Sequence, residues 1–176
     1  MILIGIGSNL AAPPAATPLD TAAAAVDALS ADETEVVTLS SWYLSEPVPV
    51  SQQPWYVNAV AAIATALPPP ALLARLLAVE RRFGRRRGAR NAARTLDLDL
   101  LDYDGRLCES AALTLPHPRL HERRFVLAPL AEIAPRWRHP RLGLSARRLL
   151  TRLPRGQEVR RLDARRTSAA APCNRK

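Results

Sequence analysis

Apolar and polar positions alternate along the chain in two distinct ways. Short apolar runs and period-two alternation, rich in Val, Ile, Thr and aromatic residues, predict strands. These patterns cover residues 2–6, 35–44, 56–65 and 95–103. Apolar residues spaced three and four apart predict helices over residues 19–29, 68–83 and 124–133. Residues 45–55 contain three prolines, and we expect an irregular loop there.

The order of these elements predicts an α+β sandwich. A strand, a helix, two strands, a helix and a strand come first, and Asp104-Gly105 then predicts a tight hairpin. Interleaving of this kind favours an open sheet with helices packed on one face. The length of 176 residues suits a single domain, which we place over residues 1–154. Residues 155–176 lack apolar periodicity, so we expect a basic, disordered tail that contributes little to catalysis.

Positive charge is concentrated in two segments. Seven arginines and no acid lie between residues 81 and 94, and residues 155–176 hold seven basic residues against two acids. The net charge of +9 is therefore not spread over a broad face, and a single basic loop suits a small polyphosphate better than a nucleic-acid duplex. No apolar run reaches the roughly 20 residues that span a bilayer, and no basic leader precedes the first strand. We expect a cytoplasmic protein that binds no membrane.

The sharpest chemical signal is a pair of aspartates in the fourth strand. Asp97 and Asp99 alternate with leucines, so both carboxylates share one face of the strand. Their Cα atoms are expected to lie roughly 6.5 Å apart, which allows both carboxylates to bind a cation. An amphipathic strand with an acidic polar face is the alternative, but like charges on one face repel unless something offsets them. Carboxylates for Mg²⁺ beside arginines for phosphate are the parts that phosphoryl transfer needs.

Seven short motifs occur in an order that is specific as a set. They are residues 5–10 (GIGSNL), 40–43 (SSWY), 54–59 (PWYVNA), 80–85, 94–99 (RTLDLD), 115–119 (LPHPR) and 123–130 (RRFVLAPL). With these motifs the chain resembles the 6-hydroxymethyl-7,8-dihydropterin pyrophosphokinases over roughly residues 1–154. The resemblance implies a ferredoxin-like βαββαβ sandwich with an added hairpin and C-terminal helices. It also implies transfer of a diphosphate from ATP, the co-substrate, to the pterin alcohol with two Mg²⁺ ions, and release of AMP.

The resemblance also implies roles for individual residues. Asp97 and Asp99 would be the metal ligands and, with Arg85 and Arg94, the catalytic residues. The other ATP contacts would be Glu80, Arg87, Leu100, Thr114, His117 and Arg123. The pterin would stack between Tyr56 and Phe125, with Asn58, Asp97 and residues Ser45, Glu46 and Val48 around its edge.

One departure and two alternatives accompany this interpretation. Where the family has Trp-Gly-Pro before the aspartate motif, this chain has Asn91-Ala92-Ala93, which affects the expected nucleotide contacts. A small two-metal nucleotidyltransferase would use the same aspartates but release diphosphate. An RNA-binding ferredoxin-like module would need a Gly-Phe-rich aromatic pattern on its central strands, which the sequence lacks. We therefore expect a monomeric enzyme that acts on small molecules and binds no nucleic acid.

Overall fold

An antiparallel sheet forms the centre of the molecule in the computed structural model. The structure describes residues 1–30, 33–85, 93–154 and 156–163. Within these residues the sheet has the strand order β5-β1-β4-β3-β8, and β2 also pairs with β4. The strands are β1 (Ile2–Ser8), β2 (Thr34–Leu39), β3 (Tyr43–Ser45), β4 (Tyr56–Thr65), β5 (Asp97–Tyr103) and β8 (Val159–Arg161). The helices are α1 (Pro18–Leu29), α2 (Pro69–Arg82), α3 (Arg124–Ile133) and α4 (Ala146–Arg152). No helix in the described ranges is both long and apolar enough to cross a bilayer.

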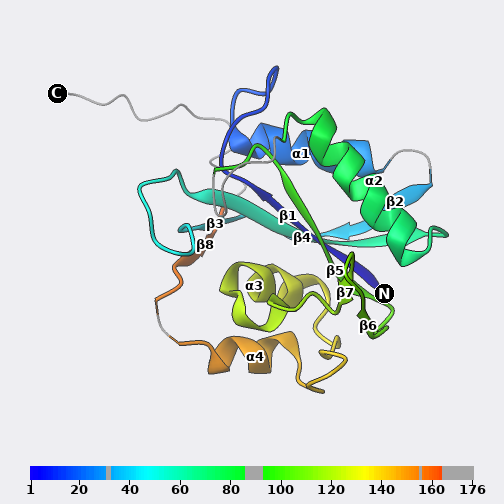
Figure 1. Ribbon diagram of the computed structural model, residues 1–176. Helices are drawn as coiled ribbons and strands as arrows, with labels where there is room; N and C mark the ends of the chain where they lie inside the picture. Colours follow the sequence, from blue (N-terminus) through cyan, green and yellow to red (C-terminus); the bar gives the residue numbers. More distant parts are fainter. Residues whose placement is uncertain (31–32, 86–92, 155, 164–176) are drawn as a thin grey trace.

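Helices cover both faces of the sheet (Figure 1), so the expectation of helices on one face is wrong. Ile2, Ile4 and Ile6 of β1 pack toward α1 and α2, whereas Leu3 points to the other face, where α3 and α4 pack. Because a strand with apolar residues on both faces must be covered twice, the uninterrupted apolar run at residues 2–6 is the sequence signal for this third layer.

The single strand expected over residues 35–44 is divided into β2 and β3. Both pair with β4, and Ser40 lies at the break between them. The Ser40 hydroxyl accepts a hydrogen bond from the Val60 N–H at 3.0 Å, while the Ser40 N–H donates to the Val60 carbonyl at 3.0 Å. The side chain therefore takes the place of a backbone acceptor, which interrupts the regular ladder.

The prediction of a hairpin at Asp104-Gly105 is also wrong: the turn forms, but the segment after it does not pair with β5. Both residues have positive φ, of 51° and 68°, and the Arg106 N–H donates to the Tyr103 carbonyl at 2.9 Å. The chain then leaves β5: β6 (Cys108–Glu109) pairs instead with β7 (Thr114–Leu115). Leu107 is 60% exposed, so its side chain does not hold this segment against β5, whereas Cys108 packs against the core.

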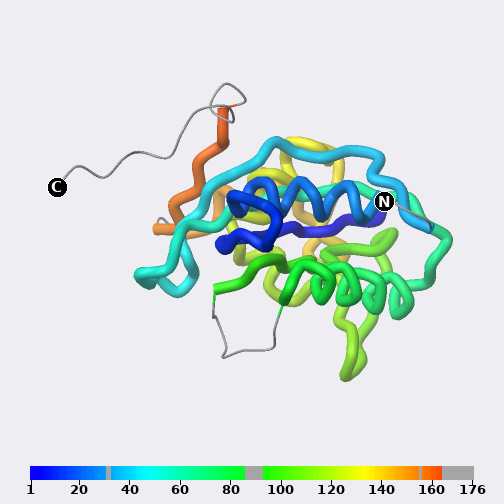
Figure 2. The backbone as a smooth tube through the Cα atoms, turned by 90° about the horizontal axis from the view of Figure 1, so that it is seen from above, coloured from blue at the N-terminus to red at the C-terminus, as the bar shows by residue number. Residues whose placement is uncertain are grey.

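Part of the segment after residue 154 belongs to the fold. The expectation of a disordered tail is therefore wrong for residues 156–163. β8 forms an antiparallel ladder with β3, with Leu44 opposite Arg160. In Figure 2 the orange backbone of this segment runs beside the cyan backbone that contains β3. A three-residue strand is too short to produce a recognisable period-two pattern, and backbone hydrogen bonds hold it without one. The remainder of the expected tail, residues 164–176, lies outside the described residues.

Candidate active site

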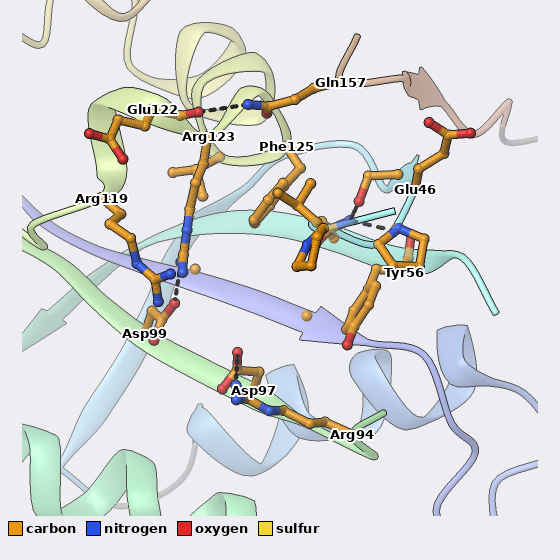
Figure 3. A pocket seen from close by; sticks show the side chains of 18 of the residues that line it. Glu46, Tyr56, Arg94, Asp97, Asp99, Arg119, Glu122, Arg123, Phe125 and Gln157 are labelled. Atoms are coloured by element: carbon orange, nitrogen blue, oxygen red, sulfur yellow. Dashed lines mark hydrogen bonds and ion pairs between the residues drawn. The ribbon is translucent and has the colours of Figure 1, made fainter. Parts of the chain in front are cut away.

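A pocket of about 550 Å³ opens on the α3 face of the sheet, at the end that α3 leaves uncovered. β1, β4 and β5 form its floor, the loop after β3 forms one wall, and η1 (Leu120–Glu122) with the start of α3 forms the other. Many residues proposed from the sequence meet here, as Figure 3 shows for several of them. The proposed residues that line the pocket are Ser45, Glu46, Val48, Tyr56, Asn58, Arg94, Asp97, Asp99, Arg123 and Phe125.

The floor of the pocket is free of side chains next to the aspartates. Gly5 of β1 lies opposite Asp99 in the ladder, and Gly7 lies opposite Asp97. Both glycines line the pocket. A Cβ at position 7 would lie 3.6 Å from the Asn58 amide oxygen and 3.8 Å from the Asp97 Cβ, so it would fill part of the space beside the carboxylate. The glycines of the first strand therefore provide room for a ligand next to Asp97 and Asp99.

Arginines bind both aspartates in the protein alone. Arg85 Nη1 and Arg94 Nη1 each lie 2.8 Å from a different oxygen of Asp97. Arg123 Nη1 lies 3.0 Å from Asp99 Oδ2. The two carboxylates would repel each other on one face of β5, and these three guanidinium groups offset that repulsion. The expected pairing of carboxylates with arginines is thus present, with Arg85 at the edge of the pocket rather than in its lining.

Glu80 lies behind this cluster and not in the pocket. It is 1% exposed, and its carboxylate accepts hydrogen bonds from the Leu98 N–H at 2.7 Å and from Arg85. Burial raises its pKa, and the contacts with Leu98 and Arg85 oppose that effect. The expected role as a direct ATP contact is therefore corrected: the side chain is buried, and it holds Arg85 and the β5 backbone between the two aspartates.

His117 contacts the aspartate cluster from the segment that follows β7. Its Nε2 lies 3.9 Å from Asp99 Oδ2, and its Nδ1 accepts a hydrogen bond from the Arg119 N–H at 3.2 Å. Burial lowers the pKa of the imidazole, against the opposing effect of Asp99, so the neutral form is favoured. Because Nδ1 is an acceptor, the neutral ring carries its proton on Nε2, on the side of Asp99.

The other end of the pocket is partly apolar and is lined by two aromatic side chains. Tyr56 from β4 and Phe125 from α3 both point into it (Figure 3). Asn58 is 5% exposed, and its amide donates to the Ser45 hydroxyl at 2.9 Å and to the Tyr56 carbonyl at 3.3 Å. Burial raises the pKa of Tyr56, so its ring remains a neutral stacking surface. A flat heteroaromatic ligand fits between such rings, with polar groups at its edge.

Beside Glu80, Arg85 and His117, which contact the aspartate cluster from outside the lining, two further proposed nucleotide contacts among the described residues do not line the pocket. Leu100 is 4% exposed and packs on the α1 and α2 side of β5. Side chains alternate along a strand, so Leu100 lies on the face of β5 that is turned away from Asp99 and the pocket. Its side chain therefore does not reach the pocket, and the expected contact of Leu100 with ATP stays a prediction. Thr114 lies on β7, opposite Glu109 and outside the pocket lining. Arg87 lies outside the described residues, as does the Asn91-Ala92 part of the departure from the family motif.

Sequence reasoning missed several residues that line the pocket. Arg119 belongs to the motif of residues 115–119 and lines the pocket, and its guanidinium makes no ion pair with any described residue. Glu122 and Gln157 also line the pocket. Gln157 belongs to the segment that was expected to be disordered. An arginine in a Pro-His-Pro-Arg motif next to a proposed phosphate contact is a signal that could have identified Arg119, whereas nothing local identifies Gln157.

The donor set of the pocket suits magnesium better than a metal that needs many protein ligands. Asp97 and Asp99 supply up to four carboxylate oxygens, and no group of three or more His, Cys, Asp or Glu side chains with metal-site geometry occurs in the described parts of the chain. Mg²⁺ commonly takes one or two carboxylates and fills its remaining positions with water and substrate phosphates. Asp97 and Asp99 therefore fit the role of magnesium ligands for a phosphate-bearing substrate.

Comparison with known proteins gives a consistent family. The model of the 7,8-dihydro-6-hydroxymethylpterin-pyrophosphokinase (HPPK) family matches residues 3–135. Three relatives carry the name 2-amino-4-hydroxy-6-hydroxymethyldihydropteridine pyrophosphokinase. The protein from Synechocystis sp. is 44% identical over 80% of this chain and 70% of its own length. Those from Haemophilus influenzae and Pseudomonas aeruginosa are 46% and 41% identical, over 74% and 79% of this chain and 79% and 83% of their own lengths.

The match extends from the first strand through α3 and so includes every element that positions the two aspartates. Each of these three relatives is more than 40% identical to this chain over most of the length of both proteins. The chain therefore belongs to the 7,8-dihydro-6-hydroxymethylpterin-pyrophosphokinase family.

Proposed function

We propose that this enzyme transfers a diphosphate from ATP to the hydroxymethyl group of 6-hydroxymethyl-7,8-dihydropterin and releases AMP. The observation that carries the proposal is that a single pocket contains both a carboxylate pair held by arginines and the side chains of Tyr56 and Phe125. The first half suits a triphosphate with its cations, and the second suits a pterin ring. The membership of the family supports the same reaction.

The pterin would occupy the end of the pocket at Tyr56 and Phe125. Its edge has alternating donors and acceptors, which match the Asn58 amide and the backbone groups of Ser45–Val48. Asn58 is already held by Ser45, so its orientation is fixed before the ligand binds. A fixed amide costs less conformational entropy on binding than a free one.

ATP would bind with its phosphates at Asp97 and Asp99, which would hold two Mg²⁺ ions. The ions would supply positive charge to the transferring phosphates. Arg85, Arg94 and Arg123 pair with the aspartates in the protein alone, and they would bind phosphate oxygens once the cations neutralise the carboxylates. Arg119 has no described ion-pair partner and would add a further guanidinium contact to the phosphates.

The pterin hydroxyl oxygen would attack the β-phosphorus of ATP, and the bond between that phosphorus and the α–β bridging oxygen would break. The alcohol releases its proton to solvent, and AMP leaves with the bridging oxygen. The protein acts mainly by aligning the two substrates and by placing positive groups where charge develops. The neutral His117, with its proton on Nε2, would serve as a hydrogen-bond donor to a phosphate oxygen and not as the base.

The fold and the setting of the enzyme complete the proposal. The spatial order β5-β1-β4-β2, with antiparallel neighbours and α1 and α2 on one face, supports a ferredoxin-like core to which α3, α4 and β8 are added. We place the enzyme in the cytoplasm as a monomer that acts on small molecules and binds no nucleic acid. In support, Arg85, Arg94, Arg119 and Arg123 gather at or beside one pocket, where they suit a small polyphosphate.

The direct test is incubation with ATP, Mg²⁺ and 6-hydroxymethyl-7,8-dihydropterin, with products followed by phosphorus NMR. The proposal expects AMP and a pterin diphosphate in equal amounts. Release of free diphosphate with a nucleotidyl product would instead identify a nucleotidyltransferase. Absence of any pterin-dependent ATP consumption would overturn both assignments.

A further inference from the structure

The segment of residues 157–162 contacts both walls of the pocket. On the side of the loop after β3, the Glu158 carbonyl accepts a hydrogen bond from the Glu46 N–H at 3.3 Å. The Arg160 guanidinium lies 5.2 Å from the centre of the Trp55 ring. The Leu162 N–H donates to the Trp42 carbonyl at 2.8 Å. The end of the segment also reaches α3, where Arg161 Nη2 lies 3.7 Å from a carboxylate oxygen of Glu132.

On the opposite wall, the side chain of Gln157 binds two backbone groups at once. Its amide nitrogen donates to the Glu122 carbonyl at 2.8 Å, and its amide oxygen accepts from the Arg124 N–H at 2.7 Å. Arg124 is the first residue of α3, and the N-cap residue Arg123 makes no side-chain capping bond. Because the first N–H groups of a helix have no partner within it, Gln157 provides the cap that the local sequence lacks.

The residue between these two backbone groups is Arg123. Its guanidinium binds Asp99 at 3.0 Å and lies 5.5 Å from the centre of the Phe125 ring. The backbone that carries a phosphate-binding group and a ring of the pterin site is therefore held on both sides of Arg123 by one amide. Figure 3 shows the bond of this amide to Glu122.

We infer that Gln157 is a positioning residue of the active site, which fixes Arg123 and Phe125 through the backbone at the start of α3. The inference rests on the proposed function, because that function gives Arg123 and Phe125 their substrates. It assigns a role in catalysis to the C-terminal segment, which the sequence pattern does not indicate. A side-chain amide suits this role because it offers one donor and one acceptor at a fixed separation.

The first test compares Gln157→Ala and Gln157→Glu with the control Glu158→Gln. Glutamate at 157 keeps an acceptor for the Arg124 N–H but cannot donate to the Glu122 carbonyl. Glu158→Gln removes an exposed ion pair with Arg160 in the same segment and leaves the contacts of Gln157 in place. We expect Gln157→Ala to lower kcat/KM for both substrates about tenfold, since misplacement by about 1 Å costs up to about 10²-fold. Gln157→Glu should lie between alanine and wild type, and the control should match wild type.

The second test asks whether Gln157 acts through Arg123. In a double-mutant cycle, Gln157→Ala added to Arg123→Ala should lower kcat/KM for ATP by less than about twofold, because the group that it positions is gone. A full tenfold loss in both backgrounds would show a general structural effect and overturn the inference. Wild-type activity in Gln157→Ala would also overturn it. If the wild-type protein shows no diphosphate transfer, the proposed function fails. If the wild-type protein is active and Gln157→Ala is equally active, only the role of Gln157 fails.

Discussion

Asp97→Asn should change nucleotide binding in opposite directions with and without magnesium. In the protein alone, the Asp97 carboxylate holds Arg85 and Arg94 at 2.8 Å and repels an incoming phosphate. The variant keeps the size of the side chain but removes the negative charge. Both arginines are then available to the phosphates, whereas the enzyme loses a ligand for the cation.

The size of the effect without metal follows from Coulomb's law. Two unit charges 4 Å apart interact by about 1 kcal/mol in water and by about 4 kcal/mol at an effective dielectric constant of 20. The Asp97 side chain is 25% exposed, so solvent screening keeps the value near the lower limit. A gain of about 1 to 2 kcal/mol corresponds to roughly 5- to 30-fold tighter binding of metal-free ATP. With Mg²⁺, turnover should fall by at least about 10²-fold, because the transferring phosphates lose charge compensation.

Calorimetric titration with a non-hydrolysable ATP analogue, in EDTA and in saturating Mg²⁺, measures both effects, and AMP release measures turnover. Asp27→Asn is the matched control, because it removes the same charge from an exposed position on α1 outside the pocket. Thermal unfolding of each variant verifies that the fold is retained. Unchanged or weaker metal-free binding in Asp97→Asn would refute the idea that the carboxylate competes for the arginines. Turnover within threefold of wild type would refute its role as a metal ligand.

Three further predictions concern other parts of the structure. Arg119→Ala should raise KM for ATP about tenfold, a loss in the range of one exposed charge-assisted hydrogen bond, and steady-state kinetics with Arg119→Lys as the partial rescue would measure it. Glu80→Gln keeps the acceptor for the Leu98 N–H but loses the charge that holds Arg85, so urea denaturation should show an unfolding free energy lower by about 1–2 kcal/mol. His139 is 3% exposed, and burial lowers its pKa below 6.5, so the unfolded chain binds more protons. Its stabilising contribution is present above about pH 6.5 and is lost as pH falls through the lowered pKa, so the difference in unfolding free energy between pH 7.5 and 5.5 should shrink in His139→Gln. An unchanged KM, an unchanged denaturation midpoint or an unchanged pH difference would contradict the respective argument.

The parts of the site that the sequence predicts are those set by local periodicity. Asp97 and Asp99 follow from the two-residue repeat of a strand, which the structure retains with alternating exposure up to Leu100. Tyr56–Thr65 and Arg124–Ile133 have the expected bounds because their patterns are long and end at prolines or polar residues. Local patterns cannot show which face of the sheet a later helix covers, and this explains why the layer formed by α3 and α4 was not expected.

Contacts between distant segments account for what the sequence did not reveal. Gln157 acts through hydrogen bonds to residues more than thirty positions earlier, and a single glutamine in a polar stretch gives no periodic signal. β8 is likewise defined by the edge of β3, which is more than a hundred residues away. Strand addition at an edge needs only backbone groups, so side-chain patterns carry little information about it.

Glu80 is different, because the sequence does contain its signal. In α2 the buried leucines Leu72 and Leu76 are four residues apart, and the next position on the same face is 80. An acid at a position that the helical repeat assigns to the core is rarely buried without a partner. That partner must be a cation or an N–H group brought by another element, and here it is Arg85 together with the β5 backbone between the two aspartates. Burying the Glu80 carboxylate costs free energy, and a fold retains such a cost mainly where function requires it. A charged residue within the apolar stripe of α2 therefore indicates the face of the helix against which the strand with the two aspartates packs.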